Sequence, residues 1–290
     1  MFNALKIILI AGCAITGFTS SGFAADLDQP IFVEQAPDLQ PVEIGNGWYI
    51  RGDIGYAMKH SGGTHTYNTF NPVTTLYSPQ TFATSDTDTD FSIGAGVGYQ
   101  FNDWLRFDGT IDAYKGKFKG TTVAGTPCVN TTLFPSYVGT TCASNDAQDY
   151  NAYQFMANAY VDLGTYVGVT PYVGVGAGYT VMSWGDLTNS SYCVPGAVAC
   201  PTGAGATVIP PVSHEGIRDY RFTYSAMAGL GYQVSKNVQL DVGYRYSKVA
   251  AGDQFKYDAA SITAGATGTQ GRDAGYDRHE LRVGMRYSLW

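Results

Sequence analysis

Apolar and polar residues alternate one by one in eight separate stretches of this chain. The last stretch shows the pattern most clearly, because every second residue from 281 to 289 is apolar while Arg282 and Arg286 fall between them and Glu280 precedes them in the same phase. Alternation with this period predicts a β-strand whose two faces meet unlike surroundings. The predicted strands are residues 48–58, 91–101, 104–115, 153–163, 172–182, 222–234, 238–247 and 281–290.

The polar faces of these strands are poor candidates for a dry core. The second strand is the plainest case, since its polar face reads Ser92, Gly94, Gly96, Gly98 and Gln100. Such a face has too little side-chain volume to fill a protein interior. Lipid on the apolar side and a polar lumen on the other satisfy both faces. A soluble, lipocalin-like barrel is the alternative, and it leaves the placement of loops and aromatic residues unexplained.

The predicted connections alternate between short and long. Short links follow the second, fourth and sixth strands, and long segments follow the others, at residues 60–90, 116–151, 183–221 and 248–278. Strands of about ten residues can cross a bilayer at a tilt. We therefore predict an all-β fold, an eight-stranded antiparallel transmembrane β-barrel with long extracellular loops and short periplasmic turns. No sequence follows the eighth strand, so we expect no appended peptidoglycan-binding module.

Aromatic residues gather near both ends of the predicted strands. A bilayer favours such residues at its two interfaces with water, where they form girdles around a barrel. The predicted girdle residues are Trp48, Tyr56, Tyr99, Trp104, Tyr179, Tyr232, Tyr287 and Trp290.

Charged residues of both signs fall on the faces that should line the lumen. Opposite charges in a confined space are expected to pair, because an unpaired buried charge is costly. We favour a structural network that fills the barrel, and a charge-lined pore is the alternative. The predicted network comprises Arg51, Asp53, Arg106, Asp108, Asp112, Asp162, Asp241, Arg245, Glu280, Arg282 and Arg286.

The start of the chain has the features of a secretory signal at residues 1–24. Lys6 precedes an apolar run, and small residues end at Ala24, where a signal peptidase would cut. Cys13 resembles a lipoprotein cysteine, but the apolar run before it is short for that role. Residues 25–46 hold several prolines without periodicity, which predicts a flexible periplasmic arm before a barrel at residues 47–290.

Four cysteines remain after the predicted signal: Cys128, Cys142, Cys193 and Cys200. An oxidising compartment permits disulfides, and four cysteines allow three pairings. We prefer Cys128 with Cys142 and Cys193 with Cys200, because each pair closes one loop. Zinc ligation is the weaker alternative, since neither pair has the spacing or the neighbouring histidines of a zinc site.

Little else in the sequence points to chemistry. A net charge of −7 with 14% charged residues gives no electrostatic footprint for nucleic acid. The Gly-x-Gly repeats lie inside strands with no following helix, so they are not nucleotide loops. Asp86, Asp88 and Asp90 lack the glycine of a calcium loop, and we interpret them as a solvated loop end.

The histidines and one possible hydrolytic set are the remaining candidates for chemistry. His60, His65, His214 and His279 fall in or beside the long loops, where we expect solvated side chains, with haem binding as the alternative. Ser247, His279 and Glu280 form a conceivable hydrolytic set that no spacing supports. We therefore predict no enzyme activity, no catalytic residue, no metal site and no cofactor.

Three features of the chain resemble the opacity-like, OmpA-type small outer-membrane barrels, the "porin family" surface antigens of alphaproteobacteria. They are the opening segment Gly-Trp-Tyr-Ile-Arg-Gly-Asp-Ile-Gly-Tyr at 47–56, the Gly-x-Gly-Tyr segments at 96–99, 176–179 and 229–232, and the closing strand. The likeness covers residues 47–290. It differs at the end, where Leu289 is in phase with the lipid face and Trp290 is one residue extra.

The resemblance implies a surface protein of the cell outer membrane with an envelope-structural and surface-contact role. Its expected partners are outer-membrane lipid, lipopolysaccharide and the barrel-assembly machinery during biogenesis. A narrow small-solute porin, or a receptor for haemin or a host surface, remains the alternative role.

Overall fold

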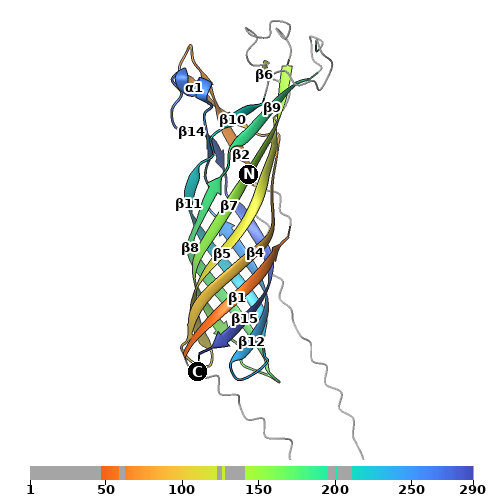
Figure 1. Cartoon of the computed structure of the whole chain (residues 1–290), viewed down its shortest axis with the longest axis vertical. Helices are drawn as coiled ribbons and strands as arrows, with labels where there is room; N and C mark the ends of the chain where they lie inside the picture. The colour runs from red at the N-terminus through yellow and green to blue at the C-terminus, as the bar shows by residue number, and fades with distance from the viewer. Residues whose placement is uncertain are drawn as a thin grey trace, which may run out of the picture. The chain divides into compact units, whose positions relative to one another are not determined.

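The computed structural model describes residues 47–58, 63–122, 126–127, 141–194, 200 and 211–289. Eight antiparallel strands pair in a closed ring, which confirms the predicted fold class. In order around the ring they are β1 (Gly47–Ala57), β4 (Thr84–Gln100), β5 (Leu105–Thr121), β7 (Thr141–Asp162), β8 (Val169–Trp184), β11 (Arg218–Gln233), β12 (Val238–Val249) and β15 (Tyr276–Ser288) (Figure 1). The predicted signal and the predicted arm lie outside the described residues.

The ring closes between the first strand and the last. β1 and β15 are paired from Tyr49 opposite Ser288 to Ala57 opposite Glu280. Closure leaves no edge in this part of the sheet, so the backbone groups there have a neighbouring strand on each side.

Three tight connections join ring strands at one end of the barrel, as predicted. Between β4 and β5 the Asn102 side chain accepts hydrogen bonds from the backbone N–H groups of Trp104 and Leu105, at 3.0 and 2.8 Å. Gly164 and Gly168 both adopt positive φ angles between β7 and β8, a conformation that glycine reaches without strain.

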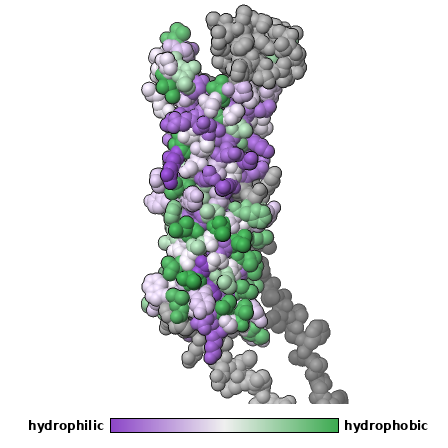
Figure 2. All heavy atoms as spheres, in the orientation of Figure 1, coloured by the Kyte–Doolittle hydropathy of each residue, from purple (hydrophilic) through white to green (hydrophobic). Residues whose placement is uncertain are grey.

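Near the tight turns, the barrel wall is apolar outside and polar inside. On β7, Tyr153, Phe155 and Val161 are exposed, whereas the alternating Gln154 and Asp162 are buried. Figure 2 shows hydrophobic residues gathered over the lower half of the visible face and hydrophilic residues over the upper half. A wall of this kind suits hydrocarbon outside and a polar interior.

Farther from the turns, the two faces exchange character. On β5 the outward positions become Lys115, Lys117 and Lys119, while Tyr114 and Phe118 are buried inside. The upper section of the barrel therefore has the arrangement of a water-soluble protein. Its core consists of Phe82, Tyr114, Phe118, Tyr150, Ala152, Met182, Trp184, Leu187, Val249, Phe255 and Tyr276.

The predicted strand ends and the extent of the long loops were therefore wrong. β4 begins seven residues before the predicted start, β5 continues to Thr121, and β7 begins at Thr141 instead of 153. The prediction followed an apolar outer face, and this face ends where the strands leave the bilayer. The period-two alternation itself continues beyond that point.

The long connections also contain regular structure of their own. A four-stranded sheet joins the first and last long connections, in the order β13 (Gly252–Lys256), β14 (Thr269–Asp273), β2 (His65–Asn71) and β3 (Leu76–Thr81). The third connection supplies β9 (Leu187–Val194) and β10 (Val212–His214), and the second supplies β6 (Thr126–Pro127).

A single short helix, α1 (Ala259–Thr263), appears in the part of the chain that the structure describes. Asp258 caps its first turn by accepting a hydrogen bond from the Ser261 backbone N–H at 2.6 Å. Within the described ranges, no helix is long and apolar enough to cross a membrane.

Candidate functional site

A charge cluster centred on Asp112 occupies the lower interior of the barrel. Asp112 is fully buried, and its two oxygens accept hydrogen bonds from Arg245 at 2.7 Å and Arg282 at 2.6 Å. Arg282 also lies 3.6 Å from Asp53 and 3.7 Å from Glu280. One guanidinium thus links three strands of the ring, β1, β5 and β15.

The other predicted lumen charges are paired in the same way. Arg51 contacts Asp53 and Asp108 at 2.7 Å each, and Arg286 contacts Asp241 at 2.6 Å. The structure places every predicted lumen residue inside the barrel, and each takes part in at least one ion pair; the remaining pairs are Arg106 with Asp162 and Arg278 with Glu280. Six arginines therefore face six carboxylates, so the charge of this network is balanced.

Tyrosines fill the space between the charges, and sequence reasoning missed them. The Arg106 guanidinium lies over the rings of Tyr160 at 4.1 Å and Tyr172 at 4.7 Å. The Tyr160 hydroxyl also accepts a hydrogen bond from Arg51 at 3.0 Å. Tyr160 shares the face of Asp162, so its phase along the strand was the signal that could have revealed it.

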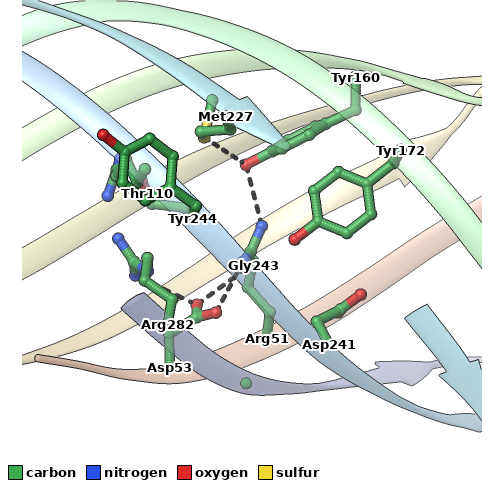
Figure 3. A pocket seen from close by; sticks show the side chains of 12 residues that line it. Arg51, Asp53, Thr110, Tyr160, Tyr172, Met227, Asp241, Gly243, Tyr244 and Arg282 are labelled. Atoms are coloured by element: carbon green, nitrogen blue, oxygen red, sulfur yellow. Dashed lines mark hydrogen bonds and ion pairs between the residues drawn. The ribbon is translucent and has the colours of Figure 1, made fainter. Parts of the chain in front are cut away.

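The space that remains in this layer is very small. Figure 3 shows Arg51, Tyr160, Tyr172 and Asp241 pointing toward one another from different strands. The cavity that they line has a volume of about 20 Å³, sufficient for about one water molecule. The lower interior is therefore packed with side chains.

A second, aromatic layer fills the interior above the charges. The hydroxyls of Tyr114 and Tyr276 are 2.6 Å apart, and the ring centroids of Tyr150 and Trp184 are 4.9 Å apart. Phe118 lies against Phe82 with the ring centroids 5.4 Å apart. This layer, here called the aromatic plug, is the core of the upper section.

His65 is part of the aromatic plug, contrary to the expectation of a solvated loop histidine. It is 3% exposed, stacks on Phe118 at 4.4 Å and has its Nδ1 atom 2.9 Å from the Gln254 side-chain oxygen. Burial lowers the pKa of His65, because desolvation disfavours the charged ring. The first connection folds back into the barrel mouth, which is why this side chain is buried.

The other histidines do not form a common site either. His214 is also buried, next to Phe255, and His60 lies outside the described residues. His279 faces outward and is hydrogen-bonded to Tyr244, whereas Ser247 and Glu280 are buried inside. The conceivable hydrolytic set is therefore divided between the two faces of the wall.

The aspartates before the second predicted strand belong to β4 and not to a loop. Asp86 is opposite Lys119 and Asp88 is opposite Lys117 on the neighbouring strand β5. Among the described residues, no group of three His, Cys, Asp or Glu side chains is arranged to hold a metal ion.

One of the two preferred disulfides is confirmed. Cys193 and Cys200 are bonded, with their Cα atoms 5.9 Å apart. Cys128 lies outside the described residues, so its pairing with Cys142 stays a prediction. Cys142 is opposite Cys193 in the β7–β9 ladder, which brings the second and third connections together.

The predicted girdle residues that the structure describes all face outward. Trp48 and Tyr99 contact each other with ring centroids 5.3 Å apart near the tight turns, and both are exposed. Toward the loops, Tyr56 contacts Phe91 at 5.2 Å. The other exposed girdle residues are Trp104, Tyr179, Tyr232 and Tyr287, while Trp290 lies outside the described residues.

A closed ring of eight strands with an apolar exterior is the architecture of small outer-membrane barrels. The family described as "Outer membrane protein beta-barrel domain" matches residues 35–267, and the chain belongs to this family. This confirms the resemblance noted from the sequence. The protein is accordingly a β-barrel of the outer membrane.

Similar proteins occur in two Brucella species, and similar folds occur among solved structures. An uncharacterized protein of Brucella suis is 33% identical over 97% of this chain and 98% of its own length, and one of Brucella melitensis is 32% identical over the same shares. Among solved structures, Neisserial surface protein A has a TM-score of 0.38 at 18% identity, covering 83% of this chain and 97% of its own. OprG of Pseudomonas aeruginosa has a TM-score of 0.42 at 10% identity, covering 84% and 97%.

Proposed function

We propose that this protein is a closed, non-conducting barrel that supports the outer membrane and presents its connections for contact at the cell surface. The observation that carries the proposal is the filled interior. Two layers of different chemistry lie one above the other inside the ring, the balanced charge network and the aromatic plug.

The charge network disfavours conduction because its groups are already paired. An ion that entered would have to separate contacts of 2.6–2.7 Å around Asp112, Arg282 and Arg51. Breaking a buried ion pair by removing one partner costs about 3–5 kcal/mol, and a passing ion would meet several such pairs. The remaining cavity of about 20 Å³ is too small for a hydrated solute.

The aromatic plug disfavours conduction for a different reason. Phe118, Met182 and Val249 are fully buried, and an ion that passed them would lose its water to apolar side chains. The polar groups beside them are already paired, as Arg221 is with Asp273 at 2.7 Å. A narrow small-solute porin, the alternative role, would need both layers to move aside.

The outward surface supports the envelope part of the proposal. The exposed apolar band, bounded by aromatic residues such as Trp48 and Tyr56, would contact lipid, and the lysines of β5 would face the lipopolysaccharide layer. During biogenesis the same closing strand, β15, would be the segment handled by the barrel-assembly machinery. The proposed role requires no enzyme activity and no cofactor, and haemin binding is disfavoured by the engagement of His65 with Gln254.

The proposal is tested by recording from planar lipid bilayers with the purified, folded protein. We expect no discrete conductance steps from the native protein. The Arg282→Ala variant is expected to stay silent too, because the aromatic plug still closes the barrel above it. Regular single-channel steps from the native protein, with a size that Arg282→Ala changes, would establish the porin role instead.

A further inference from the structure

A pocket of about 280 Å³ opens above the aromatic plug, and all four long connections contribute to its walls. Tyr67 comes from the first connection, Thr122 from the second, His214 from the third and Ser261 from the fourth. Its volume is close to the lower end of the range for small-ligand sites, about 300–1,000 Å³. Tyr67 also packs against Phe82 of the aromatic plug, with ring centroids 4.9 Å apart, so the pocket is blind below.

One wall of the pocket is an ordered network of polar groups. The buried Asp146 accepts hydrogen bonds from the Ser144 hydroxyl at 2.7 Å and the Asn189 amide at 2.6 Å. The Ser191 hydroxyl in turn donates to the Asn189 oxygen at 3.1 Å. Burial raises the pKa of Asp146, because desolvation disfavours its charged form. The network holds Ser144, Asn189 and Ser191 in fixed positions along the pocket.

Two further lining residues carry polar atoms that lack a partner among the described residues. The Nδ1 atom of His214 makes no hydrogen bond, although the residue is only 8% exposed, and the Oε1 atom of Gln270 makes none either. A buried polar atom without a partner costs about 1–3 kcal/mol. A ligand that supplies hydroxyl or amine groups would remove this cost.

Another part of the lining is aromatic. Tyr67 and Phe70 line the pocket from β2, and Phe70 is held by Tyr77, with ring centroids 5.1 Å apart. An aromatic face is suited to the apolar C–H face of a ring-shaped ligand whose polar groups point the other way.

The charge of the residues that line the pocket disfavours an anionic ligand. Asp258 lines the pocket and Asp146 lies directly behind its polar wall, whereas the described lining contains no lysine and no arginine. Sulfate, phosphate or carboxylate groups would be repelled, and they would find none of the cationic partners that bind them.

We propose that this pocket binds one sugar ring of hexose size, neutral or bearing an amine. The ring would stack on an aromatic side chain of the lining, and its hydroxyl or amine groups would pair with His214, Gln270, Ser261 and the polar wall. The proposal extends the surface-contact role proposed above by naming the class of ligand. The same ring is available as a free sugar or as the end of a glycan chain.

The test is a calorimetric titration of the full chain, folded in detergent micelles, with glucose, galactose, N-acetylglucosamine and glucosamine. Methyl glycosides and short oligosaccharides of the same sugars form a second arm, which distinguishes a free sugar from a glycan end. A sulfated disaccharide is the charge control. We expect saturable binding of at least one neutral or amino sugar with a Kd of about 1 mM or tighter, and weaker or no binding of the sulfated one.

Two substitutions on the same helix provide a matched comparison. Ser261→Ala removes a hydroxyl that lines the pocket, whereas Thr263→Ala removes an exposed one on α1. We expect His214→Phe and Ser261→Ala to weaken sugar binding by about tenfold, the effect of one lost hydrogen bond of about 1.4 kcal/mol, and Thr263→Ala to leave it unchanged. The heat-dependent gel shift of a folded barrel confirms that each variant is folded.

Several outcomes would overturn the assignment of the pocket. The assignment is wrong if the protein prefers the sulfated disaccharide, or if it binds no sugar at concentrations of about 10 mM. It is also wrong if the Ser261→Ala and Thr263→Ala variants bind sugar equally well. Bilayer recording on the same sample keeps the two proposals apart. A silent barrel without sugar binding contradicts only the pocket, and a conducting barrel contradicts the closed-barrel role.

Discussion

Charged residues inside this barrel share ion-pair partners, so the loss of one carboxylate leaves more than one arginine buried without it. Asp112 is the clearest case, because two arginines from β12 and β15 both depend on it. Removing one member of a buried ion pair is strongly destabilising, because the other charge stays buried without a partner. Removing one member of an exposed ion pair changes the stability far less, since water solvates the charge that remains.

This contrast predicts the effect of Asp112→Asn on the free energy of unfolding. We expect a loss of about 3–5 kcal/mol, because Arg245 would lose its ion-pair partner and Arg282 its nearest carboxylate while both stay buried. The matched control is Asp149→Asn, which breaks an ion pair with Lys117 whose side chains are 74% and 68% exposed. The control should change stability by less than about 1 kcal/mol. Urea unfolding in lipid vesicles measures both, and equal losses would contradict the account of the interior.

At the scale of elements, the strands are longer than the membrane requires. A β-strand needs about 9–11 residues to cross a bilayer, whereas β7 has 22 and β5 has 17. The surplus carries the strands out of the hydrocarbon, and their two faces exchange character at that point. Outward lysines at 115, 117 and 119 mark the change on β5, and outward Asn151 and Asp149 mark it on β7.

The position of this boundary is tested by two alanines on the outward face of β7. Ala157 lies in the apolar band and Ala147 lies beyond it, and both are exposed. Ala157→Lys should destabilise the barrel by about 2–4 kcal/mol, because it places a charge in hydrocarbon. Ala147→Lys should cost less than about 1 kcal/mol, even though Lys119 is its neighbour across the ladder. Unfolding in vesicles measures the difference, and equal costs would show that the boundary lies elsewhere.

The described barrel has two sections whose outer surfaces face different surroundings, although one sheet forms both. Near the turns, lipid surrounds the ring and ion pairs fill it; near the mouth, water surrounds the ring and the aromatic plug fills it. The two sections share continuous strands, yet different forces stabilise them. Each section is therefore expected to respond to its own set of substitutions.

Hydrogen exchange of two phenylalanine variants of β5 separates these sections. Phe118→Ala removes a fully buried ring of the aromatic plug and should cost about 3–5 kcal/mol locally. Amide exchange should then accelerate in the upper parts of β5 and β7, while the charge-network section stays protected. Phe107→Ala changes an exposed, outward position on the same strand and should leave the upper section unaffected. Faster exchange throughout the barrel after Phe118→Ala would contradict independent sections.

The alternating residues alone determined the number of ring strands, their faces near the turns and most of the charges that line the lumen. This was possible because side chains on a strand alternate between its faces whatever the strand pairs with. Arg278 was missed, because it precedes the predicted start of the last strand. The pattern also shows that Arg106, Asp108 and Asp112 share the lumen face, but it carries no information on which carboxylate each arginine meets. That depends on the register between strands that are far apart in the sequence, 170 positions for Asp112 and Arg282.

Tertiary structure decided the rest, and the upper section shows why. His65 and His214 belong to polar segments that resemble solvated loops, and they become buried only when those segments fold over the mouth of the ring. The aromatic plug joins Phe118 of β5 to Phe82 of the first connection and Phe255 of the last, and the pocket above it needs all four connections. Whether a side chain is buried depends on the residues that cover it, and here those residues are distant in the sequence and meet only after the ring has closed.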